Sequence, residues 1–469
     1  MKHLHLIYTL LFGVTILLFF GLAYPHHLHY QEQYQLFLFD STYVSEIVSL
    51  PGGIADLLGR FCTQFFLFAW VGALIIAVLL SLVQLLTLRL IGSWSGQTTE
   101  PSGGWLCGLS FMPSFLLWLF LLDENALLGG VWAVLLTLLA AWLYDLLPKG
   151  WVRRTVMLVT IPILYWMVGP AWSGSHYHRY PTVIPYLLYA AWLSAVILPL
   201  MGRAVHRWIN PSNRPSFFTL RSSLITFVLV SVVMGWFIRK NYNIKAEKVM
   251  QYDFMACHQQ WNRILETVNA ERPNNQIGVT VQNLALAMHG LLADHLFDYN
   301  QNGLLGLLPD VERDATSPMP TAEAFYQLGM IYVAQRTVFE AQEAFLDFQK
   351  SGRCYKRLAQ TNLIIGSYEV ARKYLMALQK TLFYRDWANE TLPLLGNEEA
   401  IAKHPEYGRL RRFVNKDNFY FSDHVTPDML ESLFYSNTDN RLALEYLKAY
   451  YMLTGDREGY AKLLLHLQK

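Results

Sequence analysis

The sequence predicts an all-α protein in two parts, a bundle of about seven transmembrane helices followed by a soluble helical domain. The chain has 469 residues, of which 53% are hydrophobic and only 15% charged. The charged residues are unevenly distributed, with 21 in residues 1–240 and 51 in residues 241–469. Apolar runs of about 20 residues, the length that a helix needs to cross a bilayer, occur only in the first part.

Seven apolar segments account for most of residues 1–240. They are Leu6–Tyr24, Phe65–Ile91, Trp105–Leu122, Leu127–Leu147, Thr155–Trp172, Val183–Met201 and Leu224–Ile238. No small-x-small cleavage site follows the first segment, so we expect it to remain as an anchor. The seventh segment is the shortest, and if it does not cross, residues 241–469 are cytoplasmic.

The short loops predict the orientation, because cytoplasmic loops carry an excess of Lys and Arg. One alternating set of loops holds nine of these residues, whereas the opposite set holds only Arg60 and Arg179. This places the N-terminus in the cytoplasm and, after seven crossings, residues 241–469 outside. Arg239 and Lys240 depart from the rule, because they follow the last segment on the outer side.

The first external loop, residues 25–64, is too patterned to be a spacer. Apolar residues recur at three- and four-residue spacing on both sides of Pro51-Gly52-Gly53. This pattern predicts two short amphipathic helices that lie along the membrane surface, with a break between them. Asp56 and Arg60 are four residues apart and should form an ion pair on one helix face.

Two carboxylates of this loop, Glu32 and Asp40, are the candidate catalytic residues. Each could act as a general base or bind a metal near the lipid headgroups, and each could equally be a solvated or helix-capping acid. The nearby histidines, His26, His27 and His29, lack a second ligand pair at metal-binding spacing, so we interpret them as interfacial residues and predict no resident metal.

The third external loop supplies the candidate phosphate-binding residues. Its sequence, from Ser173 to Tyr180, contains His176, His178 and Arg179. A guanidinium group binds a phosphate through two parallel hydrogen bonds, so Arg179 could contact a lipid phosphate. The alternative is that Arg179 neutralises Glu32 or Asp40.

Residues 241–469 have the composition of a soluble helical domain and carry no catalytic constellation. The segment AFYQLGMIYVAQRTVFEAQEAFLDF has the spacing of a tetratricopeptide helix pair, in which small Gly329 and Ala341 would let two helices approach. Similar turns are predicted at Gly366 and Gly455. The domain therefore resembles a degenerate tetratricopeptide-like solenoid, a fold that implies a protein or peptide partner on its concave face. A disulfide between Cys257 and Cys354 is compatible with an oxidising compartment.

Three phrases carry a resemblance that covers nearly the whole chain. They are HYQEQYQLFLFDSTYVSEIVSLPGGIADLLGRF, NLALAMHGLLADHLFDYNQNGLLGLL and IIGSYEVARKYLMALQKTLFYRDWA. They resemble an uncharacterised family of polytopic bacterial envelope proteins. The resemblance implies the bacterial inner membrane, with a cytoplasmic N-terminus and a periplasmic C-terminal domain.

The layout is also similar to GT-C membrane glycosyltransferases, which begin with a seven-helix module. In that class the first external loop forms two juxtamembrane helices that bear a catalytic Asp or Glu. The similarity implies a polyprenyl-phosphate sugar as lipid-linked substrate, Glu32 or Asp40 as base or ligand of a divalent metal, and Arg179 as a phosphate ligand. The chain lacks a clear Asp-x-Asp or Asp-Asp in that loop.

Three functions follow from these features. The first is an integral membrane protein that presents its helical-repeat domain for protein interaction or envelope assembly. The alternative is a GT-C-like glycosyltransferase. A transporter is the second alternative, which is disfavoured because no charged residue lies at the centre of a span and Gln84 is the most noticeable polar one. A net charge of +2 gives no reason to expect nucleic acid as a partner.

Overall fold

The computed structural model describes residues 4–94, 104–148, 150–169, 186–208, 216–310, 317–345, 349–414 and 427–468. Its described residues form helices and no strand, which confirms the all-α prediction. The chain divides into two compact units, Met1–Ile244 and Lys245–Lys469. We call them the membrane unit and the helical unit, and describe each by itself.

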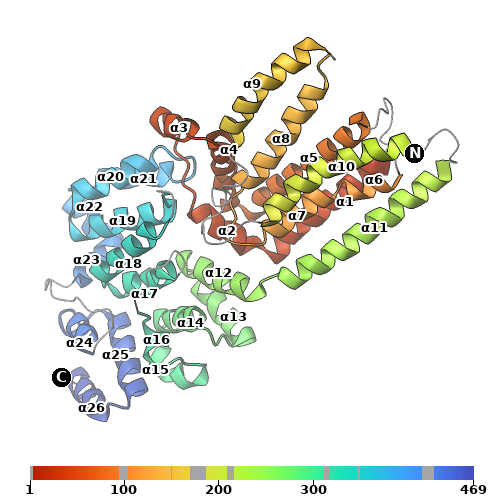
Figure 1. Ribbon diagram of the computed structural model, residues 1–469. Coiled ribbons are helices and arrows are strands. Elements are labelled where there is room, and N and C mark those ends of the chain that lie inside the picture. The colour runs from red at the N-terminus through yellow and green to blue at the C-terminus, as the bar shows by residue number, and fades with distance from the viewer. Residues whose placement is uncertain are drawn as a thin grey trace. The chain divides into compact units, whose positions relative to one another are not determined.

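The membrane unit consists of long apolar helices and of the short helices α2, α3 and α4, which follow the first long helix in the sequence and lie at the end of the bundle away from the N-terminus (Figure 1). Its helices are α1 (Leu4–Leu18), α2 (Pro25–Gln33), α3 (Ser41–Val48), α4 (Gly53–Thr63), α5 (Ala69–Trp94), α6 (Gly104–Leu109), α7 (Met112–Phe120), α8 (Gly129–Asp145), α9 (Trp151–Val168), α10 (Tyr186–Trp208) and α11 (Ser216–Asn241). A π-helical turn, Phe19–Ala23, extends α1.

Five helices of the described chain are long and apolar enough to cross a membrane. They are His5–Ala23, Ala69–Trp94, Trp151–Val168, Tyr186–Ala204 and Arg221–Asn241. Two shorter apolar stretches, Gly104–Phe120 and Gly129–Asp145, correspond to the third and fourth predicted segments. The seventh segment, which the sequence made the shortest, lies in a helix with 21 residues of membrane-compatible composition.

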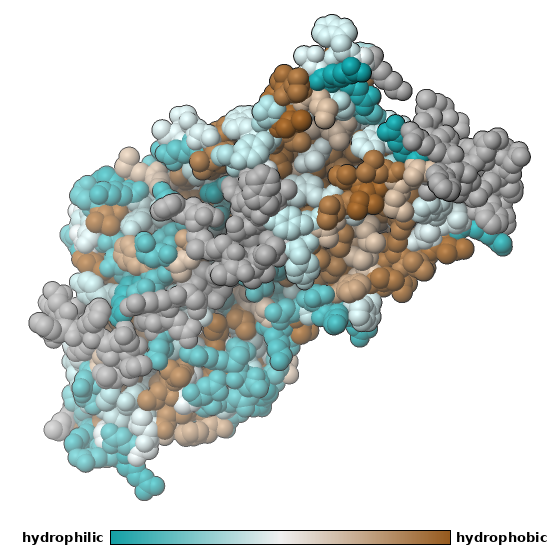
Figure 2. Space-filling model, in the orientation of Figure 1, coloured by the Kyte–Doolittle hydropathy of each residue, from teal (hydrophilic) through white to brown (hydrophobic). Residues whose placement is uncertain are grey.

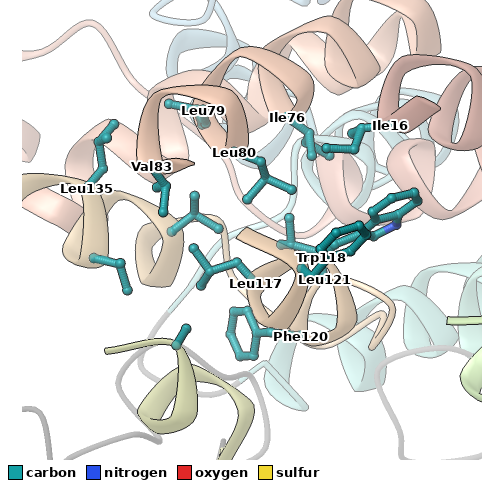
Figure 3. Packing of buried hydrophobic residues seen from close by; sticks show 14 of the residues in the cluster. Ile16, Ile76, Leu79, Leu80, Val83, Leu117, Trp118, Phe120, Leu121 and Leu135 are labelled. Atoms are coloured by element: carbon teal, nitrogen blue, oxygen red, sulfur yellow. The ribbon is translucent and has the colours of Figure 1, made fainter. Parts of the chain in front are cut away.

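The core of the membrane unit surrounds α5. Figure 3 shows Leu80 and Val83 of α5 beside Leu117 and Phe120 of α7, among a larger set of buried side chains. Rings of α1 and α7 contact one another, since Phe12 lies 4.9 Å from Phe115, centroid to centroid. These interdigitated side chains remove the inner faces of the helices from solvent.

The outer faces of the same helices are apolar as well. Leu10, Leu158 and Val232 are 68%, 74% and 66% exposed. Figure 2 shows hydrophobic residues gathered over this part of the chain. Contiguous apolar surface is rare on water-soluble proteins, so these helices are compatible with a lipid environment.

A chain of hydrogen bonds crosses the core at Gln84, which is fully buried. The Thr9 hydroxyl of α1 donates to Gln84 Oε1 over 2.7 Å, and the Gln84 amide donates to Ser110 Oγ over 3.0 Å. The Ser110 hydroxyl in turn donates to the Cys107 carbonyl. Gln84 therefore connects α1, α5 and the break between α6 and α7, which is a structural role.

The first and last helices of the membrane unit meet at one end. The Tyr242 hydroxyl, just after α11, donates to the Ala23 carbonyl over 3.1 Å. The backbone N–H of Asn243 donates to the Tyr24 hydroxyl over 3.2 Å. The two partners of each bond are 219 positions apart in the sequence.

The helical unit contains fifteen α-helices in its described residues. They are α12 (Ile244–Cys257), α13 (Trp261–Glu271), α14 (Gln276–Met288), α15 (Leu292–His295), α16 (Leu304–Leu307), α17 (Pro318–Leu328), α18 (Ile331–Glu343), α19 (Gly352–Ile365), α20 (Tyr368–Leu378), α21 (Arg385–Thr391), α22 (Glu398–Lys403), α23 (Tyr407–Phe413), α24 (Pro427–Tyr435), α25 (Arg441–Thr454) and α26 (Arg457–Leu467).

One type of turn recurs between consecutive helices of this unit. A residue with positive φ ends the first helix, and the next residue donates its N–H to the carbonyl five positions back. This happens after α12, α14, α17, α19 and α25, at Gln259, Gly290, Gly329, Gly366 and Gly455. The pattern is the Schellman motif, in which glycine avoids the steric cost of a left-handed backbone. The turns predicted at Gly366 and Gly455 are thereby confirmed.

Gly329 has a φ of +91° and forms the left-handed end of α17. Its small size also lets Phe413 of α23 approach, while Ala341 is the small buried residue of α18. The disulfide that an oxidising compartment would permit is absent. Cys257 and Cys354 are both free thiols. Cys354 Sγ lies 3.5 Å from Met319 Sδ in the core, so its packing partner is a thioether rather than a second cysteine.

Candidate functional site

Glu32, the first candidate carboxylate, lies in α2 immediately after the first apolar helix. Pro25 occupies the first turn of α2, where its missing N–H leaves no helical bond unmade. Glu32 is only 6% exposed, and the neighbouring Gln31 amide donates to the Ala126 carbonyl over 3.1 Å. The helix is thus held against the loop before α8, with its acid inside the protein.

Asp40, the second candidate carboxylate, stands in a different environment. It directly precedes α3 in an extended conformation and is partly exposed. The Thr42 hydroxyl donates to Asp40 Oδ2 over 2.7 Å, and the Asp40 carbonyl accepts from the N–H of Val44. Asp40 therefore occupies the N-cap position of α3, but its side chain makes no capping hydrogen bond to the helix.

Arg179, His176 and His178, the candidate phosphate-binding residues, lie outside the described residues. Their proximity to Glu32 or Asp40 stays a prediction.

The predicted ion pair between Asp56 and Arg60 is confirmed on α4. Arg60 Nη2 lies 2.8 Å from Asp56 Oδ2, and both side chains are only 12% exposed. The Tyr43 hydroxyl of α3 donates to the Leu36 carbonyl over 2.8 Å. Burial raises the pKa of Tyr43, with Arg60 opposing the shift. Burial lowers the pKa of Arg60, but the charges and hydrogen bonds of Asp56 and Tyr43 together outweigh burial, so the pKa is raised.

The first-loop histidines make ring contacts. His27 stacks on Tyr24 with 4.7 Å between ring centroids, and His26 and His29, one turn apart, lie 5.8 Å from each other. Within the described ranges, no group of three or more His, Cys, Asp or Glu residues is arranged to hold a metal ion.

A buried ionic network in the helical unit was not predicted from the sequence. Arg353 of α19 donates two hydrogen bonds to Asp253 of α12, of 2.6 and 2.8 Å. One turn further along α19, Arg357 pairs with Glu323 of α17 and lies 3.7 Å over the Tyr326 ring. The i, i+4 spacing of the two arginines was visible, but their partners are distant in sequence.

This network surrounds groups with shifted pKa values. Burial lowers the pKa of Lys356, whose ammonium lies 5.2 Å over the Trp387 ring. Burial also raises the pKa of the Cys257 thiol. The two arginines and two carboxylates balance through direct pairing across α12, α17 and α19, so these ion pairs connect the three helices.

A cavity of about 590 Å³ at one end of the membrane unit was also missed. Polar and apolar residues of α7, α10, α11 and the loop after α7 line it. Its polar members are Asp123, Glu124, Lys240, Asn241 and Asn243. The signal available in the sequence was the position of Lys240, a basic residue on the side of the last helix where the loop rule does not expect one.

Comparison with known proteins gives one match. A family model described as a family of unknown function, DUF6057, matches residues 2–173 and 170–469. No curated protein and no solved structure matches the chain. The match confirms the expectation of an uncharacterised family that covers nearly the whole chain.

Proposed function

The chain belongs to DUF6057, a family of unknown function, and we propose that it is an integral membrane protein that presents a helical-repeat domain for protein interaction or envelope assembly. The observation that carries the proposal is the pairing of two chemically opposite units in one chain. One unit exposes apolar side chains outward, and the other buries them in a core. The membrane unit would be the anchor and the helical unit the interaction module.

Contacts at the two ends of the membrane unit support seven crossings. At one end, Gln31 bonds to Ala126, the Gly52 N–H donates to the Trp166 carbonyl over 2.8 Å, and Tyr242 bonds to Ala23. These contacts connect α2 to the loop before α8, the turn before α4 to the end of α9, and the residue after α11 to the end of the first apolar helix.

Contacts at the opposite end involve the other termini of these helices. Ser93 of α5 donates to Asp145 of α8, and Asp145 pairs with Arg153 of α9 over 2.8 Å. Gly202 of α10 packs against Ile91 of α5. The apolar helices α8 and α9 therefore run between the two ends. This supports a seven-span topology, which would put the helical unit on the side opposite the N-terminus.

The excess of basic loop residues at the second end supports a cytoplasmic assignment for it. In a bacterial inner membrane, the helical unit would then be periplasmic. The recurrent glycine turns between its helices support the repeat interpretation, because tetratricopeptide-like arrays are built from such helix pairs.

Photo-crosslinking of the full chain in cells tests this function. A photoreactive residue replaces Tyr332 or Phe339, which are 43% and 39% exposed on α18, two turns apart. The matched control replaces Leu158, 74% exposed on α9. We expect discrete protein adducts from the α18 positions, and protease digestion of the helical unit from the periplasmic side. A protected helical unit, or α18 positions that give no protein adduct, would contradict the proposal.

A GT-C-like transfer from a polyprenyl-phosphate sugar is the second candidate, favoured by the burial of Glu32 in a short helix at the end of the first span. A buried carboxylate can be tuned as a general base. Glu32→Gln and Asp40→Asn variants, with normal membrane levels, should then lose sugar transfer. Transfer at the wild-type rate in both variants would reject this candidate.

A further inference from the structure

The cavity of about 590 Å³ in the membrane unit combines a charged mouth with apolar walls. All of its lining residues belong to the membrane unit. Its volume lies within the range of small-molecule and cofactor sites, which is roughly 300 to 1,000 Å³.

The walls are provided by three helices. The apolar residues that line them are Leu116, Leu119, Phe120 and Leu122 on or just after α7, Leu187 on α10, and Met234 and Phe237 on α11. Along α11, the six-residue step from Met234 to Lys240 corresponds to about 9 Å of helix. This depth suits the upper part of an acyl chain, which would pack against the apolar side chains of the walls. A fully polar ligand would offer those side chains no apolar surface to bury.

The mouth carries charges of both signs. Asp123 and Glu124 come from the loop after α7, and Lys240, Asn241 and Asn243 come from the end of α11 and the residues after it. The Asn125 N–H donates to Asp123 Oδ1 over 2.8 Å, which orients that carboxylate. Lys240 follows the last span on the outer side, where the excess of basic residues in cytoplasmic loops does not predict a lysine. A role in the cavity would account for its position.

Aromatic residues indicate the depth of the mouth in a bilayer. Tyr186 and Trp236 are 68% and 58% exposed, and the Lys240 ammonium lies 5.3 Å from the Trp236 ring centroid. Exposed Tyr and Trp residues with a neighbouring Lys are typical of the membrane–water interface. The mouth is therefore at headgroup level and the walls reach into the hydrocarbon.

We propose that this cavity binds one phospholipid whose headgroup carries both a phosphate and a primary ammonium. The phosphate contacts Lys240 and the asparagine amides, the ammonium contacts the carboxylates of Asp123 and Glu124, and the upper acyl chain packs between α7 and α11. A purely anionic headgroup meets repulsion from two carboxylates, and a quaternary ammonium has no N–H to donate to them.

A second groove of the membrane unit illustrates why charge matters here. It holds about 460 Å³ between α1 and α5, and its lining is almost entirely apolar, with Gly13, Ala77 and Ser81 among its residues. Nothing in that lining selects one occupant over another.

Lipid retention by the full chain tests the proposal. The protein is reconstituted with equal amounts of phosphatidylethanolamine, phosphatidylglycerol and phosphatidylcholine, extracted in mild detergent, and its bound lipids are quantified by mass spectrometry. Lys240→Gln is compared with Arg239→Gln, a matched change at the adjacent exposed residue that does not line the cavity. We expect the wild type and Arg239→Gln to retain phosphatidylethanolamine preferentially. Retention by Lys240→Gln should fall about tenfold, the effect of one charge-assisted hydrogen bond.

A double variant, Asp123→Asn with Glu124→Gln, tests the ammonium contact separately. We expect it to lose the preference for phosphatidylethanolamine and to retain phosphatidylglycerol instead. Thermal unfolding with each lipid added gives a second readout, because a ligand that binds the folded state raises the Tm. Equal retention of the three lipids by the wild type, or equal losses in Lys240→Gln and Arg239→Gln, would overturn the proposal.

Discussion

The long apolar helices of the membrane unit and the helices of the helical unit bury polar groups in different ways. The Asp56–Arg60 ion pair of the membrane unit belongs to the first loop, outside those long helices. In the core of the membrane unit the buried polar side chains around Gln84 are neutral amides and hydroxyls. In the helical unit Asp253 and Arg353 form a bidentate ion pair that is about 10% exposed, at 12% and 8%. The difference shows how the surroundings of a helix decide which polar groups its neighbours can carry.

The physical reason is the free-energy cost of burying a charged group without a compensating partner. A charge at the bilayer centre costs several kcal/mol even after local adjustment, so a membrane core is better served by hydrogen bonds between uncharged groups. A domain that folds in water can bury an ion pair when geometry and additional hydrogen bonds offset desolvation. The following tests address this contrast, beginning with the largest expected effect.

Breaking the buried ion pair should destabilise the helical unit strongly. Arg353→Ala leaves the Asp253 carboxylate buried without its bidentate partner, which typically costs about 3 to 5 kcal/mol. Hydrogen exchange of α12 and α19 in the full chain measures the loss. Arg372→Ala is the matched control, because its pair with Glu369 is exposed and should contribute about 0 to 1 kcal/mol. If α12 and α19 exchange hydrogen at the same rate in Arg353→Ala and Arg372→Ala, the buried ion pair contributes no more than the exposed one, and the contrast between the units fails.

The glycine turns should differ among themselves according to their surroundings. A Cβ at Gly329 would lie 2.6 Å from Phe413 Cβ, whereas a Cβ at Gly455 would meet nothing within 4 Å. Both have positive φ, which costs an L residue about 1 to 2 kcal/mol. Overpacking adds about 1 to 3 kcal/mol for Gly329→Ala. Denaturant unfolding should therefore give a lower free energy of unfolding for Gly329→Ala than for Gly455→Ala. The reverse order would refute the packing argument.

The neutral network of the membrane unit should contribute less than the ion pair. Gln84→Leu removes its two interhelical hydrogen bonds and should cost about 1 kcal/mol, the usual size of such bonds between membrane helices. Unfolding in mixed detergent micelles measures the change. Thr9→Val and the double variant complete a double-mutant cycle. Additive effects of the two substitutions would mean that Thr9 and Gln84 are not coupled.

Cys354 should react only when the helical unit unfolds, because it is buried, whereas Cys257 is partly exposed. Burial raises the pKa of Cys354 to about 11, so at pH 8 about a thousandth of it is thiolate. Between pH 9 and 11 the unfolded chain releases this proton and the folded chain keeps it, so this thiol makes the helical unit less stable as the pH rises. Without reductant, iodoacetamide should label Cys257 and Cys354 in urea. Labelling of neither would indicate the disulfide that the structure lacks.

The helical architecture could be predicted from the sequence because hydropathy and glycine turns are local signals. The Asp56–Arg60 pair was predictable for the same reason, since its partners are four residues apart on one helix. The break at Ser110–Phe111 between α6 and α7 was not predicted, although Pro113 lies in the first turn of α7. Proline restricts the backbone around it, which is a local signal for a helix start. The Ser114 hydroxyl, however, donates to the Leu80 carbonyl of α5, and this contact depends on how a second helix packs.

The residues of the lipid cavity and the ionic network could not be found in this way. Asp123 and Lys240 are more than a hundred positions apart in the sequence. Asp253 and Arg353 are separated by 100 positions. A single sequence gives each residue type and its local spacing, but the pairing comes from how helices pack. Glu32 and Asp40 were identifiable as acids of one loop, and their different burial was not.

The hydrogen bonds between Ala23 and Tyr242, and between Tyr24 and Asn243, have a consequence for biosynthesis. Their partners are separated by 219 residues, which a ribosome translates in about 10 to 45 s at roughly 5 to 20 residues per second. The first span must therefore wait in the bilayer, without its final partner, until the last span leaves the translocon. A chain truncated before residue 242 should insert but lack this closure, which makes its N-terminal span more open to membrane quality-control proteases.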